Sequence, residues 1–286
     1  MTHKLAIITG ASDGLGRATA IGLATTGRYR VALIARRQAQ LEEVQAACGG
    51  ASVASVHVAD CTDRAAVDGA IRDILAHWEQ QQGGYSSIVL VNNVGRGCAV
   101  QPSVLTTETI DDMMKVNVYP AVFATQAILP VMKAAGRGKI FFNSSVVSRI
   151  VPSTVNGAGR SAYAMAKAAL NMFIETLRIE LALEGSPIIL SLINMGFIAT
   201  MFGLNAGGVD SRTVPGAIPE AEAAAKMIRQ IELDVPTDEY LPERDYQRVV
   251  DFFTSRGRPG DLHRAEAVAR AGAGAAAAAD DAAATQ

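Results

Sequence analysis

Two side chains at a helical spacing have the chemistry to move a proton. Tyr163 and Lys167 stand four positions apart in a long helical pattern, residues 162–184, so they project from one face about one turn apart. A free tyrosine has a pKa of about 10, too high for an efficient base near neutral pH. A nearby ammonium group favours the phenolate and lowers that pKa. The pair is therefore a candidate acid–base unit acting on a substrate oxygen.

Hydroxyl groups at the end of a predicted strand could assist this pair. Ser144 and Ser145 follow the apolar run 139–143. A serine hydroxyl can hydrogen-bond a substrate oxygen on which negative charge develops. A tyrosine and a lysine at this spacing are also common on ordinary helix surfaces, so the interpretation needs an independent motif elsewhere in the chain.

A glycine-rich turn near the N-terminus provides that motif. The apolar run 5–9 precedes it, and a helical pattern follows over residues 15–26. The spacing is G-x-x-x-G-x-G rather than G-x-G-x-x-G, but the physical demand is the same. Glycines allow a tight turn and close approach of the backbone to a pyrophosphate, which the helix N-terminus then faces. We predict that the dinucleotide is bound by Gly10, Ser12, Asp13, Gly14, Leu15 and Gly16.

The end of the second predicted strand, residues 30–35, indicates which dinucleotide is bound. An acidic residue there favours NAD, whereas a nearby arginine favours NADP. Here Ala35 is followed by Arg36 and Arg37. A guanidinium binds phosphate oxygens through its planar fork, and Ser12 can add a hydrogen bond. We therefore predict NADP(H) as the cofactor. The alternative is that the two arginines form a solvated helix start.

These motifs, in this order, resemble the short-chain dehydrogenase/reductase family over roughly residues 4–242. The resemblance implies hydride transfer between a nicotinamide and a carbonyl or alcohol, with a catalytic set of Asn117, Ser145, Tyr163 and Lys167. In this set the lysine also holds the nicotinamide ribose, and the asparagine holds a water of the proton relay. The gap between Ser145 and Tyr163 is longer than is usual in the family. We assign the surplus to a loop over residues 152–160.

The resemblance also implies further cofactor contacts. An aspartate at the position of Asp60, with Cys61 beside it, contacts the adenine. The segment Asn93, Val94 and Gly95 packs under the cofactor. The segment that binds the nicotinamide carboxamide supplies Gly196, Ile198 and Thr200. Two residues depart from the family pattern, namely Val94 in place of alanine and Met195 in place of proline.

Strand and helix patterns alternate along the chain, which predicts a Rossmann-like α/β fold. The strands are apolar on both faces, as in a doubly wound parallel sheet covered by helices on both sides. Pro130 should kink or break its helix. The predicted strands are 5–9, 30–35, 53–58, 88–92, 139–143, 188–193 and an edge strand, 238–241. The predicted helices are 15–26, 38–47, 64–80, 107–135, 162–184, 221–233 and 243–255.

We expect one NAD(P)-binding catalytic domain over residues 1–260 and an Ala-rich, disordered tail over 261–286. Residues 196–219 lose all periodicity and follow a strand, which is typical of a substrate lid. This lid contains Phe197, Met201, Phe202 and Leu204. It therefore indicates an apolar or amphipathic carbonyl substrate, such as a ketone, an aldehyde, a 3-oxoacyl compound or a steroid-like molecule.

Composition bounds the remaining possibilities. The 286 residues are 49% hydrophobic and 19% charged with a net charge of −2, which indicates a globular protein and gives no electrostatic case for a nucleic-acid partner. Three scattered cysteines and four separated histidines indicate neither disulfides nor a metal site. We expect no signal peptide, no membrane span and a cytoplasmic location. The family resemblance implies a homodimer or homotetramer that pairs the helices 107–135 and 162–184.

Two other functions stay open. The chain could be an NADP-binding sensor or scaffold without physiological turnover, and cofactor binding without activity on carbonyl compounds would favour that function. A hydrolase or acyltransferase using Ser145 would need a base, but the sequence places no histidine to activate that serine.

Overall fold

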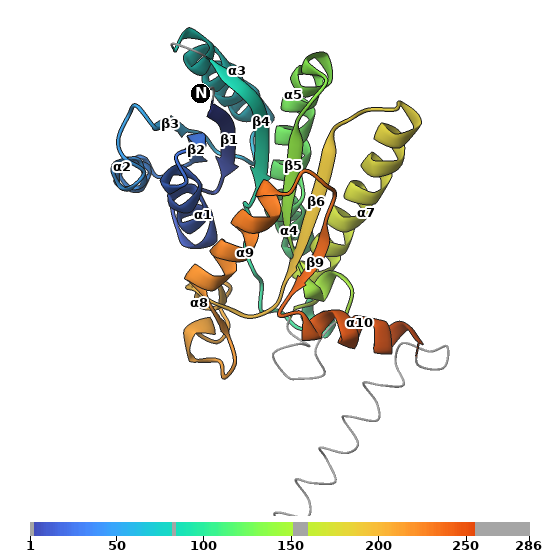
Figure 1. The fold of residues 1–286 in the computed structure, drawn as a ribbon. Coiled ribbons are helices and arrows are strands. Elements are labelled where there is room, and N and C mark those ends of the chain that lie inside the picture. Colours follow the sequence, from blue (N-terminus) through green and yellow to red (C-terminus); the bar gives the residue numbers. More distant parts are fainter. Residues whose placement is uncertain (1–2, 82–83, 151–159, 255–286) are drawn as a thin grey trace, which may run out of the picture.

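The computed structural model describes residues 3–81, 84–150 and 160–254. They form a three-layer α/β structure around a seven-stranded sheet with the order β3-β2-β1-β4-β5-β6-β9, in which all neighbours are parallel (Figure 1). The order reverses between β1 and β4, the place where open parallel sheets bind ligands. The strands are β1 (His3–Thr9), β2 (Tyr29–Ala35), β3 (Ala54–Val58), β4 (Tyr85–Asn92), β5 (Lys139–Ser145), β6 (Ile189–Met195) and β9 (Asp238–Leu241). The predicted fold class is confirmed.

Helices cover both faces of the sheet, as Figure 1 shows. One apolar core lies under α1, α2 and α9, and the other lies under α3, α5 and α7. The helices are α1 (Gly14–Thr25), α2 (Gln38–Ala47), α3 (Arg64–Gln80), α4 (Thr107–Asn117), α5 (Tyr119–Ala135), α7 (Ser161–Leu183), α9 (Glu220–Glu232) and α10 (Arg244–Thr254), with short 3-10 turns at η1 (Pro102–Val104) and η2 (Val146–Ser148).

Consecutive residues of strand β1 are apolar, without the usual alternation with polar residues, because both faces of the strand are buried. Leu5 and Ile7 belong to one core, whereas Ala6 and Ile8 belong to the other. Successive side chains of a strand point to opposite faces, and here both faces are covered by helices. The sheet therefore brings the carboxyl ends of its strands to one edge, where the predicted motifs stand.

The expected interruption of the helix 107–135 lies at a different proline. Helix α4 ends before Val118, whose backbone (φ −112°, ψ −54°) departs from helical geometry, and α5 begins at Tyr119. Pro120 has no N–H, so the carbonyl of Val116 loses its helical donor. Helix α5 continues through Pro130 to Ala135, with Pro130 on the exposed side, where water can satisfy the freed carbonyl. Of the prediction that Pro130 would kink or break the helix, the break is wrong.

Residues 196–219 contain short elements rather than an irregular chain. β7 (Ile198–Ala199) pairs in parallel with β8 (Ile218–Pro219), and between them lie α8 (Phe202–Asn205) and the 3-10 turn η3 (Ser211–Thr213). This lid segment follows the carboxyl end of β6, next to α9 (Figure 1). Of the other regions predicted from the sequence, residues 152–159 of the surplus loop and the whole tail 261–286 lie outside the described residues.

Within the part of the chain that the structure describes, one helical stretch, Thr107–Ala135, passes a length and hydropathy test for a membrane span. This is weak evidence, because core helices of soluble proteins pass the same test. The expected lack of a membrane span stays a prediction.

Candidate active site

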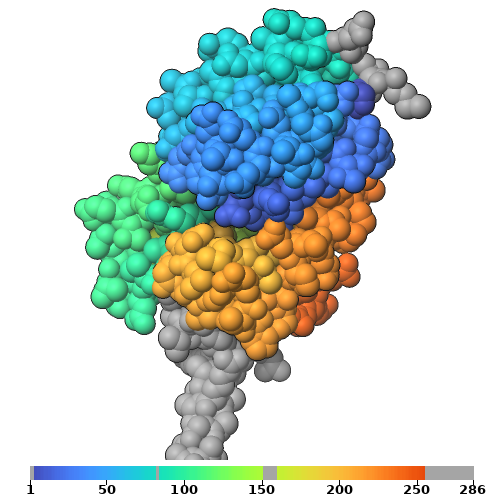
Figure 2. Space-filling view, turned by 90° about the vertical axis from the view of Figure 1, so that its left-hand side faces the viewer, coloured from blue at the N-terminus to red at the C-terminus, as the bar shows by residue number. Residues whose placement is uncertain are grey.

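One pocket of about 720 Å³ brings the predicted motifs together at the carboxyl edge of the sheet. Its wall includes the glycine-rich turn, the ends of β2, β3, β4 and β5, the start of α7 and the lid segment. Figure 2 shows this face, on which the N-terminal residues (blue) meet the lid segment (orange). The predicted residues that line the pocket are Gly10, Ser12, Asp13, Gly14, Leu15, Arg36, Arg37, Asp60, Cys61, Asn93, Val94, Gly95, Ser145, Tyr163, Lys167, Gly196, Ile198 and Thr200.

The glycine-rich turn is built for close backbone contact. Gly10 has φ +68°, and Asp13 caps α1 by accepting a hydrogen bond from the Gly14 N–H at 2.8 Å. Gly16 does not line the pocket. A Cβ at that position would lie 2.2 Å from the Gly10 carbonyl oxygen and 2.5 Å from Nδ2 of Asn93. Gly16 is therefore required for packing of the turn against α1.

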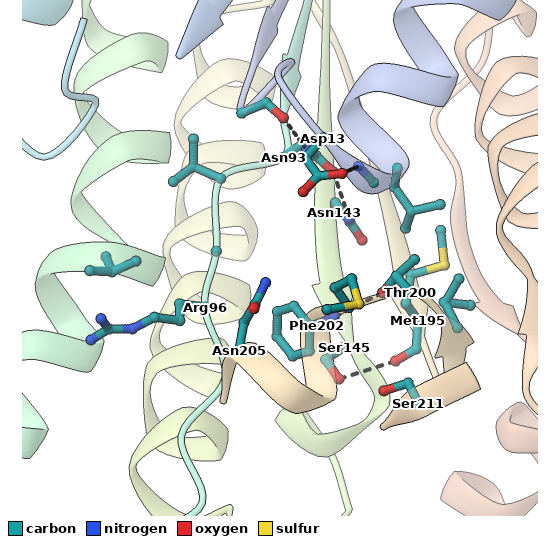
Figure 3. A pocket seen from close by; sticks show the side chains of 18 of the residues that line it. Asp13, Asn93, Arg96, Asn143, Ser145, Met195, Thr200, Phe202, Asn205 and Ser211 are labelled. Carbon is teal, nitrogen blue, oxygen red and sulfur yellow. Dashed lines mark hydrogen bonds between the residues drawn. The ribbon is translucent and has the colours of Figure 1, made fainter. Parts of the chain in front are cut away.

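Asn93 holds this turn from the end of β4. Its backbone N–H donates to the Thr9 hydroxyl at 3.1 Å, and its Nδ2 lies 3.3 Å from the Gly10 carbonyl oxygen. Its Oδ1 accepts from Nδ2 of Asn143 at 3.0 Å. Figure 3 shows this chain of amides between the turn and β5. Asn93 thus fixes the switch point of the sheet as well as lining the pocket.

At the far end of the pocket, Arg37 turns toward the glycine-rich turn. Its Nη2 donates to the Ser12 hydroxyl at 3.1 Å and lies 3.4 Å from a carboxylate oxygen of Asp13. Asp60 accepts hydrogen bonds from the N–H and hydroxyl of Thr62, which hold the pKa of its carboxyl below the usual range. Burial raises the pKa of the Cys61 thiol to about 12, so Cys61 is a neutral wall residue.

Burial dominates the electrostatics of the candidate catalytic pair, Tyr163 and Lys167. It raises the pKa of Tyr163 to about 12, although a hydrogen bond with Ser145 acts in the opposite direction. It also lowers the pKa of Lys167 to about 8. The lysine Nζ donates to the Asn143 carbonyl oxygen at 2.9 Å and lies 5.9 Å from the centroid of the tyrosine ring. Without cofactor, desolvation of the phenolate outweighs the hydrogen bond with Ser145 and the charge of Arg160, so the pKa of Tyr163 is not lowered. The expectation that the oxidised nicotinamide and Lys167 together favour the phenolate stays a prediction.

Ser145 is the serine of the pair that faces Tyr163. Its hydroxyl donates to the Met195 carbonyl oxygen at 3.1 Å, as Figure 3 shows. Ser144 also lines the pocket, but its hydroxyl donates to Oδ1 of Asn171 at 2.6 Å.

Asn117 is buried behind the pocket wall and does not line it. Its Oδ1 accepts from the Arg96 N–H, and its Nδ2 donates to the carbonyl oxygens of Arg96 and Met113, each at 3.0 Å. A Cβ on Gly95 would lie 2.9 Å from Oδ1 of Asn117 and 3.5 Å from Nζ of Lys167. The side chain of Asn117 therefore fixes the loop after β4. Its role in holding a water stays a prediction.

The segment after β6 is tied to the end of β9. The Gly196 N–H donates to the Leu241 carbonyl oxygen at 2.7 Å, and a Cβ on Gly196 would lie 2.7 Å from a carboxylate oxygen of Asp245. Thr200 accepts from the Phe202 N–H at 3.3 Å, which starts α8. These contacts place Ile198 and Thr200 on the pocket wall.

The lid segment supplies apolar side chains to the pocket. Phe197, Met201 and Phe202 line it, and the Phe202 ring lies 5.6 Å from that of Tyr163. Leu204, on α8, is 42% exposed and does not line the pocket.

Several pocket residues were missed by reasoning from the sequence. Asn143 had a usable signal, since it stands two residues before Ser145 on the same face of β5. Arg96 could be taken for a solvated loop residue, but it lines the pocket, and its guanidinium pairs with Asp112. Arg160 also lines the pocket; the sequence placed it only in the surplus loop 152–160, without a role of its own.

Comparison with known proteins gives the family. Residues 4–206 match the model of short chain dehydrogenases. A "Dehydrogenase/reductase SDR family protein 7-like" from Anopheles gambiae is 32% identical over 270 residues, which cover 86% of this chain and 78% of that protein. The chain belongs to the short-chain dehydrogenase/reductase family, so it is an oxidoreductase that binds NAD(P).

Two solved structures support the same conclusion. A short-chain dehydrogenase from Streptomyces avermitilis matches with a TM-score of 0.73 and 27% identity, over 94% of this chain and 99% of its own. An alcohol dehydrogenase from the archaeon Thermococcus sibiricus, complexed with 5-hydroxy-NADP, matches with a TM-score of 0.68 and 26% identity, over 83% of this chain and 95% of its own.

Proposed function

We propose that this protein uses NADP(H) to interconvert a carbonyl and a secondary alcohol on an apolar or amphipathic small molecule. One observation carries the proposal, namely that the glycine-rich turn and the Ser145–Tyr163–Lys167 group border the same pocket. The turn fits a dinucleotide because Gly10, Ser12 and Gly14 line the pocket, and α1 directs its N-terminus to the same place.

The residues divide the chemistry between them. The bound nicotinamide would supply or accept the hydride at the carbonyl carbon. Tyr163 donates its proton to the substrate oxygen during reduction, while the Ser145 hydroxyl stabilises the charge that develops there. Lys167 holds the nicotinamide ribose and restores the proton of Tyr163. Asn117 holds the loop around Gly95 and, by family resemblance, a water of this relay.

Three features support NADP(H) over NAD(H). Strand β2 ends in Ala35 with no carboxylate, and both Arg36 and Arg37 line the pocket. The guanidinium of Arg37 donates a hydrogen bond to the Ser12 hydroxyl, so the two groups lie side by side at this end of the pocket. Such a pair suits a 2′-phosphate. The solved alcohol dehydrogenase from Thermococcus sibiricus was obtained with an NADP derivative.

The proposed substrate class follows from Phe197, Met201 and Phe202, which give the pocket an apolar side next to Tyr163. Ketones, aldehydes, 3-oxoacyl compounds and steroid-like molecules fit that description. We further propose a cytoplasmic homodimer or homotetramer that pairs α5 and α7. The hydrolase alternative loses support, because no described residue lining the pocket is a histidine.

The test is the initial rate of NADPH and NADH oxidation over a panel of ketones, aldehydes and 3-oxoacyl thioesters. We expect NADPH to be preferred by at least about tenfold, with Ala35→Asp reversing the preference because its carboxylate repels the 2′-phosphate and accepts from the ribose hydroxyls. A wild-type preference for NADH would contradict the cofactor proposal. Tight NADPH binding without turnover on the whole panel would favour a sensor.

A further inference from the structure

Arg160 lies at the start of the helix that carries Tyr163. It immediately precedes α7, one turn before Tyr163, and lines the pocket. Its backbone is held on two sides, since it pairs with Val100 in a parallel bridge and its carbonyl oxygen accepts from the Ala164 N–H at 2.8 Å. The position of its Cα is therefore fixed relative to the catalytic helix.

The guanidinium of Arg160 differs from the other guanidiniums near this end of the pocket. Arg96 pairs with Asp112, and Arg212 pairs with Asp210 at 2.7 Å. Arg160 makes no ion pair with any residue in the described ranges, and the residues just before it, 151–159, contain no acidic side chain. Its guanidinium carbon lies 5.0 Å from the centroid of the Phe197 ring.

Partial burial of the Arg160 guanidinium, unpaired among the described residues, destabilises the protein without ligand, and a bound anion would offset that penalty. Arg160 is partly buried, and burial lowers the pKa of its guanidinium from the ordinary value, although an arginine stays charged in proteins. A desolvated charge is costly unless it is paired. Stacking on Phe197 supplies part of the compensation and orients the planar fork. Its hydrogen-bond donors remain available for an anion with two oxygens.

We propose that Arg160 is a specificity-determining residue that binds a carboxylate of the substrate, so that the substrate class is a keto acid with an apolar body. This inference rests on the proposed function and refines it. The carbonyl would meet Tyr163 and Ser145, the apolar body would contact the lid segment, and the carboxylate would meet the guanidinium. Bidentate contact with a carboxylate is the geometry that arginine favours.

The experiment uses aryl keto acids in which the spacer between carbonyl and carboxylate grows stepwise, each compared with its methyl ester. For at least one spacer we expect wild-type enzyme with NADPH to prefer the acid over the ester. Arg160→Gln should lower kcat/KM for that acid by about 30-fold, mainly through KM, and change the ester by less than about threefold. Arg160→Lys should retain part of the preference, because it keeps the charge but loses the fork.

Arg212→Gln is the matched control, since it removes a guanidinium that already has a carboxylate partner. It should leave the ratio of acid to ester kcat/KM unchanged. Melting temperature and NADPH affinity report whether each variant is folded and binds cofactor.

Three results would overturn the proposal. The wild-type enzyme could treat every acid and its ester alike. Arg160→Gln could slow both equally and shift the pH profile, which would mean that the arginine acts through Tyr163. The variant could instead lose NADPH affinity, which would mean that Arg160 binds the cofactor rather than the substrate.

Absence of turnover with all compounds would count against the proposed function. In that case, binding of an aryl carboxylate to the NADPH complex of wild type but not of Arg160→Gln would still support the anion site, and equal binding would overturn it.

Discussion

At the scale of single residues, burial gives the pair Tyr163 and Lys167 its properties. Desolvation penalises each charged form, so it holds the phenol neutral and makes the ammonium unusually easy to deprotonate. Both groups therefore stay protonated as the pH rises, until Lys167 loses its proton. The proposed reduction requires this state, because in it the phenol of Tyr163 donates a proton.

These protonation states predict how the rate of ketone reduction depends on pH. Below about pH 8 both groups are protonated, and above it Lys167 is the first to lose its proton. With saturating NADPH, kcat/KM for a ketone should be flat below about pH 8 and fall by up to about tenfold per pH unit above it. The oxidative rate should rise over the same interval.

Lys167→Arg is the control for this profile. Because a guanidinium stays charged and cannot pass a proton to Tyr163, the variant should be slower at every pH and should lose the descending limb near pH 8. A wild-type reductive rate that is constant or rises up to pH 10 would show that Lys167 does not control proton supply.

Residue types at known spacings made most of the site predictable. Tyr163, Lys167 and the glycines could be found because chain-local geometry already places them together. Asn143 offered a signal of the same kind, because it lies on the same strand face as Ser145. The role of Arg160 depends on which strand ends and loops meet across the sheet edge, and a single sequence does not contain those distances.

At the scale of elements, the contact between the glycine-rich turn and α1 leaves no room for a side chain at Gly16. A Cβ on Gly16 would meet the Gly10 carbonyl, which is backbone and cannot move away as a flexible side chain could. By contrast, Gly69 lies inside α3 with nothing within 4 Å of its Cβ position. The two glycines make a matched pair.

Gly16→Ala should lower the free energy of unfolding in urea by about 1–3 kcal/mol through overpacking, and it should weaken NADPH binding. Gly69→Ala should raise the free energy of unfolding by about 0.4–1 kcal/mol and leave binding unchanged, because it restricts only the unfolded chain. Equal stability and NADPH affinity in wild type and Gly16→Ala would show that the turn does not need this close approach.

The elements themselves were predictable where periodicity is long. The ranges expected for α2 and α3 agree with the structure, as does that of the edge strand β9. Short elements in the lid were not predictable, because two-residue strands such as β7 and β8 have no period. The helix break was placed at the wrong proline, since the sequence does not show that Pro130 faces water while Pro120 stands at a helix start.

At the scale of the whole molecule, helix α7 exposes an apolar stripe that the monomer leaves uncovered. Met165, Met172 and Ile179 recur every seven residues, and they are 49%, 63% and 61% exposed. Residues at that spacing lie on one face of a helix. On α5, Tyr119 is 44% exposed. These residues support the proposed pairing of α5 and α7 between subunits.

Met172→Glu should convert the oligomer to a monomer at micromolar concentration, because it places a charge in the centre of an apolar interface. Size-exclusion chromatography with light scattering measures the change. Val58→Glu is the control, since Val58 is 54% exposed on the opposite edge strand β3. A wild-type protein that is monomeric at this concentration would refute the assembly, as would a Met172→Glu protein of unchanged mass.

Fold class was the most predictable property at this scale, because strands buried on both faces and joined by helices permit few arrangements. The sheet order and its switch point agree with that expectation. The number of subunits and the substrate were not predictable to the same degree. Both depend on surfaces and cavities that several distant segments form together.

Tyr163 is the proposed proton donor in an NADP(H)-dependent carbonyl reduction. The most direct test is to measure NADPH binding by fluorescence and NADPH oxidation with the best ketone for wild type and Tyr163→Phe. We predict unchanged affinity for NADPH and a loss of turnover of about 10³-fold, since only the proton donor is removed. Turnover by Tyr163→Phe at the wild-type rate would contradict the account.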